Sequence, residues 1–141
     1  MTGYLLDTSI CIALFRGNHE VERRMNSLGA QNCFICDVVV AELKYGAFKS
    51  ERVEQNLEQI SEFAKRIRVI PFADCIDVFC QEKLRLQKSG KPIEDFDLLI
   101  GCAAKAKGLT MVTHNVKHFE HIEGITIEDW LCKKNNYDSD K

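Results

Sequence analysis

Three acids and one amide stand where short apolar segments end. Asp7 directly follows the first apolar run, and Asn115 comes shortly after the fourth. Glu42 lies about one turn into the helix expected after the second run, and Asp97 is at the start of the most apolar helix. In an open parallel sheet, sites form beyond the carboxyl ends of the strands. We therefore expect these four oxygen-bearing side chains to converge at one edge of a sheet.

Each acid also has a purely structural interpretation. Asp7 could cap a helix, Asp97 could stabilise a helix dipole, and Glu42 could be solvated. However, Glu42 and Asp97 have apolar neighbours, where an unpaired carboxylate is costly. Carboxylates close together repel each other unless a proton or a cation bridges them. Oxygen ligands favour a hard cation, so the sequence predicts Mg²⁺, with Mn²⁺ as the alternative, held by Asp7, Glu42 and Asp97.

Such a cation binds phosphate and lowers the pKa of water, which is the chemistry of phosphodiester hydrolysis. The predicted mechanism is in-line attack of water on the phosphate, with a carboxylate assisting deprotonation. It requires no Ser, Cys or His nucleophile. The hydroxyls of Thr8, Ser9 and Thr113 are expected to orient carboxylates or waters, with plain capping and turn roles as the alternative. Asp95 is predicted to be either a ligand through water or a helix cap.

Strands and helices alternate along the chain and must position these residues. Strands are predicted at 4–6, 33–36, 68–72, 110–112 and 126–128, and helices after Asp7 and at 19–28, 38–48, 51–66, 74–88 and 96–107. The alternation predicts an α/β fold with a central, mostly parallel twisted sheet of four to five strands and helices on both faces. One domain is expected over 1–132, with a frayed polar tail over 133–141.

Apolar spacing groups residues on one face of each of two predicted helices. In 38–48 the predicted face runs through Val38, Ala41, Tyr45 and Phe48. In 74–88 it runs through Ile76, Phe79, Cys80 and Leu84.

Composition narrows the class of protein. The net charge of −2 excludes a globally basic nucleic-acid binder but not a local basic track. No apolar run is long enough for a membrane span, and the N-terminus has no signal-peptide pattern. Seven irregularly spaced cysteines favour reduced thiols in a cytoplasm. Cys33 and Cys36 are interpreted as buried thiols, because no second pair completes a zinc site.

A basic track for a nucleic-acid backbone is a further hypothesis, with simple solvation of exposed charges as the alternative. Its candidate members are Lys44, Lys49, Lys83, Arg85, Lys88 and Lys91. His114 is expected to approach a phosphate of that backbone. A zinc site on His114, His118 and His121 is disfavoured because the segment is rich in loop residues.

Four segments together resemble the motifs of PIN domains. They are YLLDTS at 4–9, VAELKYG at 40–46, PIEDFDLLIG at 92–101 and VTHNVKHF at 112–119. They occur in the family's order and span nearly the whole chain. For a single domain of this length, the resemblance is to VapC toxins of toxin–antitoxin pairs.

The resemblance implies an endoribonuclease that cuts structured RNA of the tRNA or rRNA class and stops translation. It further implies a VapB-like antitoxin, a homodimer, and contact with operator DNA only through the antitoxin. The alternatives are a PIN-domain RNA-processing nuclease outside toxin–antitoxin systems and a catalytically inactive RNA- or protein-binding scaffold. Where the family often has a fourth acid, this chain has Asn115. We therefore expect one firmly held ion, a second being uncertain, with Asn115 assisting through water. The family pattern selects Asp97 over Asp95 as the direct ligand.

Overall fold

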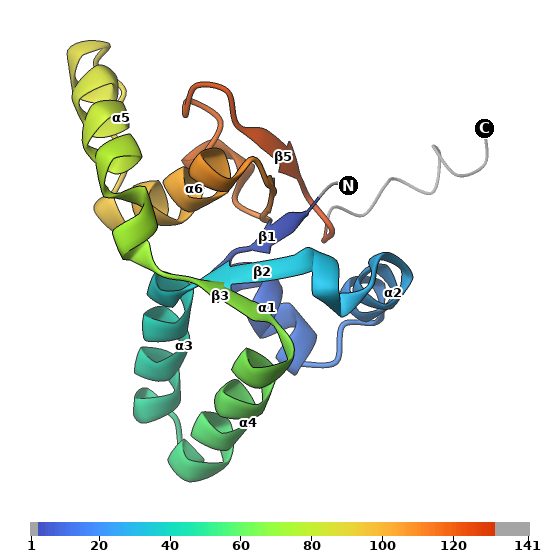
Figure 1. The fold of residues 1–141 in the computed structure, drawn as a ribbon. Coiled ribbons are helices and arrows are strands. Elements are labelled where there is room, and N and C mark those ends of the chain that lie inside the picture. Colours follow the sequence, from blue (N-terminus) through green and yellow to red (C-terminus); the bar gives the residue numbers. More distant parts are fainter. Residues whose placement is uncertain (1–2, 132–141) are drawn as a thin grey trace.

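A five-stranded parallel sheet forms the centre of the protein, for which the computed structural model describes residues 3–131 (Figure 1). The strands are β1 (Tyr4–Leu6), β2 (Cys33–Cys36), β3 (Arg68–Ile70), β4 (Thr110–Val112) and β5 (Thr126–Glu128). Their order is β3-β2-β1-β4-β5, and every neighbouring pair is parallel. The predicted α/β fold with a parallel sheet is confirmed. The tail, expected to fray, lies outside the described residues.

Six helices flank the sheet on both faces (Figure 1). They are α1 (Thr8–Phe15), α2 (His19–Leu28), α3 (Asp37–Lys49), α4 (Val53–Arg66), α5 (Ile76–Lys88) and α6 (Asp95–Lys107). Helix α6 packs against β1 and β4, and α3 contacts both α1 and α6. Helices α1, α3 and α6, which follow or carry the candidate acids, are therefore neighbours.

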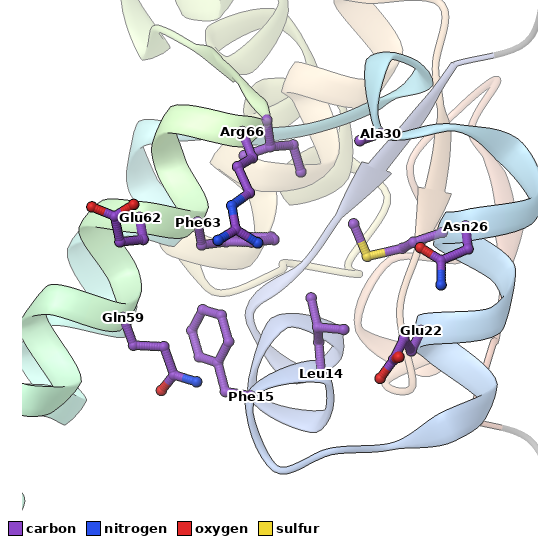
Figure 2. A pocket seen from close by; sticks show the side chains of 11 residues that line it. Leu14, Phe15, Glu22, Asn26, Ala30, Gln59, Glu62, Phe63 and Arg66 are labelled. Carbon is purple, nitrogen blue, oxygen red and sulfur yellow. The ribbon is translucent and has the colours of Figure 1, made fainter.

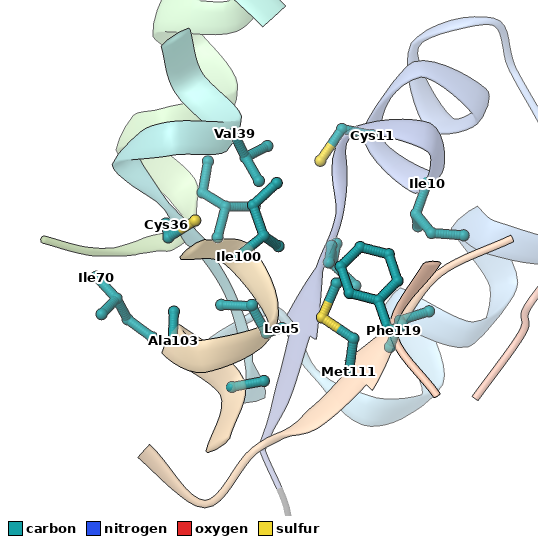
Figure 3. Close-up of a cluster of buried hydrophobic side chains, with 14 of the residues drawn as sticks. Leu5, Ile10, Cys11, Cys36, Val39, Ile70, Ile100, Ala103, Met111 and Phe119 are labelled. Atoms are coloured by element: carbon teal, nitrogen blue, oxygen red, sulfur yellow. The ribbon is translucent and has the colours of Figure 1, made fainter. Parts of the chain in front are cut away.

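The central strands are buried because helices cover both faces, so their residues are continuously apolar rather than alternating. Leu5, Leu6, Met111 and Val112 are fully buried. Figure 3 shows Leu5 and Met111 within one cluster with side chains from α1, α3 and α6. The edge strand β3 differs, since Arg68 and Val69 are exposed.

Local signals fix the helix ends. Asp7 caps α1 by accepting a hydrogen bond from the Ile10 N–H at 3.1 Å. The Glu94 carboxylate caps α6 by accepting from the Asp97 N–H at 3.3 Å. Gly108 ends α6 with φ of 65°, a left-handed conformation that favours glycine. The interpretation of Asp95 as the cap is therefore wrong, because its neighbour Glu94 has that role.

The helices predicted over 38–48 and 74–88 are present, but the apolar residues grouped by spacing are not the ones that each helix buries. On α3 the buried residues are Val39, Leu43 and Ala47, while Tyr45 and Phe48 are 65% and 64% exposed. On α5 the buried apolar residue is Leu86, while Ile76, Cys80 and Leu84 are exposed. Each helix carries two apolar stripes at helical spacing, and spacing cannot tell which stripe faces the core.

The segment after β3 also differs from the prediction. The expected strand over 68–72 ends at Ile70, and Phe72–Cys75 form a 3-10 helix. The Asp37 carboxylate accepts from the Phe72 N–H at 3.0 Å. This contact turns the chain away from the sheet edge.

A buried acid, Glu82, joins three parts of the fold. Its carboxylate accepts a two-pronged hydrogen bond from Arg85, with distances of 2.9 Å to Nε and 2.7 Å to Nη2. It also accepts from Lys105 on α6 and from the Glu123 backbone N–H. Arg85 in turn donates to the His121 carbonyl at 2.7 Å. Helices α5 and α6 and the segment 121–123 are thereby held together.

Candidate active site

Asp7 is fixed on all sides at the point where β1 becomes α1. Its Oδ1 accepts from Ser9 Oγ at 2.6 Å, and its Oδ2 accepts from Thr113 Oγ1 at 2.5 Å. Thr113 follows β4, the neighbour of β1, and is completely buried. The Asp7 N–H donates to the Val112 carbonyl. The side chain, 4% exposed, therefore has one orientation.

Glu42 and Asp97 come from α3 and α6 and are partly buried. Glu42 Oε1 accepts from Thr8 Oγ1 at 2.5 Å, which links α3 to the first turn of α1. Asp97 Oδ2 lies 3.0 Å from His118 Nδ1. Each of the predicted hydroxyls, on Thr8, Ser9 and Thr113, thus donates a hydrogen bond to a candidate acid.

The three acids act on one another electrostatically. Burial raises the pKa of Asp7 against the opposing effect of its hydrogen bonds. Burial raises the pKa of Glu42, and the negative charges of Asp97, Glu94 and Asp7 raise it further. Burial also raises the pKa of Asp97, His118 opposes this, and Glu94 and Asp7 add to the increase. The charge of Asp7 is therefore near enough to raise the pKa of both Glu42 and Asp97.

The donor chemistry fits a hard cation. Within residues 3–131, Asp7 and Glu42 have no ion pair with a lysine or arginine, and Asp97 contacts only the ionisable ring of His118. Mutually repelling oxygens without a cationic partner are what Mg²⁺ stabilises. As placed, no three His, Cys, Asp or Glu side chains of the described residues form a complete metal cage. Binding of a cation therefore requires side chains to move. The contact between Asp97 and His118 is the one that would have to change.

Asp95 and Asn115 lie at the margins of this set. Asp95 is exposed and pairs with Lys83 at 3.0 Å. Asn115 is exposed, and its backbone N–H donates to Thr113 Oγ1 at 2.9 Å. Glu94, the N-cap of α6, was not predicted from the sequence, because the usual N-cap residues are Ser, Thr, Asp and Asn.

The basic track is only partly available to a ligand. Lys83 pairs with Asp95 and Arg85 with Glu82, so both are engaged within the fold. Lys49 lies over the Tyr45 ring at 4.5 Å. Lys44, Lys88 and Lys91 make no ion pair with any acid of residues 3–131 and are exposed. His114 Nδ1 lies 3.2 Å from Asp129.

Three hollows near the acids are lined by two cationic residues, Arg16 and Lys117, that were not predicted from the sequence. Arg16, at the end of α1, lines one groove with Ser9 and His114 and another with Glu42. On the other side, Lys117 lines a cleft that reaches Asp97. Neither residue stands out in sequence, because its proximity to the acids depends on the tertiary fold.

A separate groove of about 430 Å³ lies between α4 on one side and α1 and α2 on the other (Figure 2). Its floor is apolar, and Phe15 and Phe63 pack edge to face with ring centres 5.2 Å apart. Glu22, Glu62 and Arg66 lie on its rim (Figure 2). Such an open apolar surface with a polar rim is typical of a docking site for another polypeptide.

The cysteines and the apolar helices of the described residues were also subjects of prediction. The six described cysteines are free, and Cys33 and Cys36 are buried. Burial raises the pKa of each of these two thiols to about 11, which makes them poor nucleophiles. No helix within 3–131 has the length and apolar character to cross a bilayer.

Comparison with known proteins identifies relatives over nearly the whole chain. A model of the PIN domain matches residues 4–125. The tRNA(fMet)-specific endonuclease VapC of Shigella flexneri is 35% identical, over 92% of this chain and 99% of that protein. Ribonuclease VapC2 of Rickettsia felis is 35% identical, over 90% and 97%. A crystal structure of DNA-bound VapBC from Salmonella typhimurium matches with a TM-score of 0.85 at 33% identity, over 92% and 99%.

Proposed function

The chain belongs to the PIN-domain family, and from that premise we propose that it is a VapC-type endoribonuclease dependent on a divalent cation. The observation that carries the proposal is the set of Asp7, Glu42 and Asp97: the charge of Asp7 raises the pKa of the other two, and no lysine or arginine of the described residues pairs with any of the three. The ribonuclease names of the relatives support the reaction type.

We propose Mg²⁺, with Mn²⁺ as the alternative, held by Asp7, Glu42 and Asp97. When bound, the cation would lower the pKa of water and stabilise charge on the scissile phosphate. We expect one firmly held ion, because Asn115 offers a neutral oxygen and Asp95 is engaged by Lys83.

The protein's own side chains orient the candidate acids and take a proton from the attacking water. Ser9 and Thr113 hold Asp7 in one rotamer, which removes the cost of ordering it during the reaction. Thr8 binds Glu42 Oε1, leaving Oε2 to take a proton from the attacking water. The raised pKa of Glu42 brings its basicity closer to neutral pH, where a general base is more effective.

Cleavage of RNA by the purified protein tests the proposal. Activity should require Mg²⁺ or Mn²⁺ and should be lost on Asp97→Asn. The matched control is Asp95→Asn, two residues away on the same helix, which removes a surface pair with Lys83 and should retain activity. Equal cleavage in chelator would refute cation dependence. Equal loss in both variants would refute the selection of Asp97.

We further propose that the substrate is a structured RNA of the tRNA or rRNA class and that cleavage stops translation. The name of the Shigella flexneri relative supports tRNA. An RNA substrate and free thiols are consistent with a cytoplasmic location. Mapping of RNA ends after expression of wild type and of the Asp97→Asn variant identifies the target. Unchanged tRNA and rRNA would contradict this class.

A VapB-like antitoxin is the proposed protein partner, because solved relatives are VapBC complexes. We place it on the apolar groove of Figure 2. The exposed Gln59 lies on the rim of that groove, whereas the exposed Gln55, one turn earlier on α4, does not line it. Gln59→Arg should weaken antitoxin binding and spare RNA cleavage, and Gln55→Arg should change neither. Equal binding by both variants would exclude this groove. Operator DNA is expected to be contacted only through the antitoxin.

A homodimer is the remaining part of the proposal. Two helices carry large apolar side chains that an isolated chain exposes to water. They are Ile76 and Leu84 on α5, and Tyr45 and Phe48 on α3. Light scattering should give twice the 16.1 kDa mass of the chain. The Leu84→Lys variant should shift the protein towards the single-chain mass. A wild type that is monomeric at all concentrations would exclude the dimer.

A further inference from the structure

A cleft of about 460 Å³ opens beside Asp97. One wall is the segment that leads into α6, with Lys91 and Ile93. The other is formed by Lys117 and His121, from the segment that follows β4. The two walls are separated by more than twenty residues in sequence and meet only in the fold. Asp97 and Glu94 lie within the same cleft. The cleft therefore places two lysines beside Asp97, one of the candidate acids.

Lys91 and Lys117 are exposed and make no ion pair with any acid of residues 3–131. Three other lysines of the described residues are in ion pairs: Lys83 with Asp95, Lys105 with Glu82, and Lys107 with Asp74. In the cleft, two lysines face two carboxylates. Once a cation neutralises Asp97, the positive charge of the cleft is in excess. An anion is the ligand that this balance selects.

The walls of the cleft are held in place by the network of the buried Glu82. Arg85 donates to the His121 carbonyl at 2.7 Å, and the Glu82 carboxylate accepts from the Glu123 N–H at 2.8 Å. On the inner side, His118, next to Lys117 in sequence, lies 3.0 Å from Asp97. Lys117 is thus positioned by a segment that is anchored both at the acids and at α5.

These observations bear on where the RNA backbone runs, and the inference rests on the proposed function. When the scissile phosphate lies at the acids with a cation between them, the nearest other anion of the same strand is the phosphate of the adjoining nucleotide. We propose that Lys91 and Lys117 bind this neighbouring phosphate in the cleft beside Asp97. Lysine suits this role as a flexible point charge for a phosphate. The basic track thus runs across the cleft, away from Lys83 and Arg85.

The test compares two double variants that remove the same charge. Lys91→Gln with Lys117→Gln empties the cleft of its lysines. Arg23→Gln with Lys65→Gln, the control, removes two cations from exposed pairs on α2 and α4. Each is made in a Glu42→Gln background, which keeps the RNA intact during the measurement. Glu42 does not line the cleft, so this change leaves the cleft itself unaltered. The probe is a fluorescent RNA stem-loop with Mg²⁺ present, and anisotropy is followed over a salt series.

The cleft variant should bind the probe about fivefold more weakly per lysine at about 0.1 M salt, and the slope of log K against log salt should fall by about 0.7 per lysine. The control should keep the wild-type slope. In the background with Glu42 intact, the cleft variant should raise KM for cleavage more than it lowers kcat. Equal slopes in the two double variants would overturn the proposal.

Two further outcomes separate this inference from its neighbours. If the protein with Glu42 intact does not cut RNA with Mg²⁺, the proposed function fails, whatever the lysines do. If it cuts RNA and the cleft variant loses only antitoxin binding, with the RNA slope unchanged, the cleft is a protein-binding surface and the phosphate subsite is refuted. Loss of RNA affinity with antitoxin binding retained supports the subsite.

Discussion

Replacing the buried Glu82 by glutamine should destabilise the fold in a manner that depends on pH. The Arg85 guanidinium, aided by the Glu123 N–H and Lys105, lowers the pKa of Glu82 from the usual 4.5 to about 2, although burial opposes this. A carboxylate whose pKa is lowered on folding stabilises the folded state above its unfolded pKa, and this contribution is lost as the pH falls below that value. The relevant window therefore lies below about pH 4.5.

The size of the effect follows from these two values. The difference between 4.5 and about 2 corresponds to about 3 kcal/mol at about 1.4 kcal/mol per pH unit. Arg85 is 38% exposed, so solvent screens part of this interaction. We expect Glu82→Gln to lower the free energy of unfolding by about 2 kcal/mol at about pH 7, and the deficit to shrink by about half at pH 3.

Urea denaturation followed by circular dichroism across this pH range measures the deficit. Glu20 provides a matched control, because the pKa of its carboxyl is also lowered to about 2, by Arg23 and Arg24, but at the surface of α2. Exposed pairs contribute little, so Glu20→Gln should leave the midpoint unchanged. A deficit for Glu82→Gln that does not vary with pH, or an equal deficit for Glu20→Gln, would refute the reasoning.

Three further predictions concern the site and its support. Thr113→Val removes a hydrogen bond that favours ionised Asp7, so it should raise the pKa of Asp7 and move the acidic limb of the pH–cleavage profile to higher pH, whereas Thr113→Ser should not; superimposable profiles for the valine variant and wild type would count against it. Mg²⁺ should raise the melting temperature of wild type, because it binds only the folded state, and should raise that of Asp97→Asn less in the same scanning fluorimetry; an equal rise would remove Asp97 from the ligands. Gly101→Ala places a Cβ 2.3 Å from Ile122 Cδ1, so it should cost about 1–3 kcal/mol of stability in a thermal melt, and an unchanged melt would show that Ile122 moves freely.

The acids could be predicted from the sequence because their positions follow from local patterns. Asp7 directly follows a short apolar strand, and parallel strands bring their carboxyl ends to one edge. Asp97 begins a helix so apolar that only a buried, sheet-packed position explains it. The order and type of the elements also follow from alternating apolar runs and turn residues. Each of these signals spans only a few neighbouring residues, so it can be recognised in a single sequence without knowledge of the fold.

Other features depended on partners far away in sequence and could not be predicted. Tyr45 and Leu84 lie on apolar stripes that spacing alone assigns to the core, but a competing stripe is buried instead. Arg85 looked like a free basic residue because its partner Glu82 is itself buried by the packing of α5 on α6. Lys117 reaches the candidate site only because the segment after β4 folds back towards Asp97.

The strand order has a consequence for when the site first exists during synthesis. Strand β1 is made first but lies between β2 and β4, and Asp7 is held by Thr113, 106 residues further along the chain. A nascent chain that ends before β4 has Asp7 and Glu42 but not the hydroxyl that orients Asp7. Nor has it the lysine-bearing segment after β4, which forms one wall of the cleft. The candidate site therefore comes together only after β4 and the segment behind it have been synthesised, so a product truncated before β4 lacks Thr113 and Lys117.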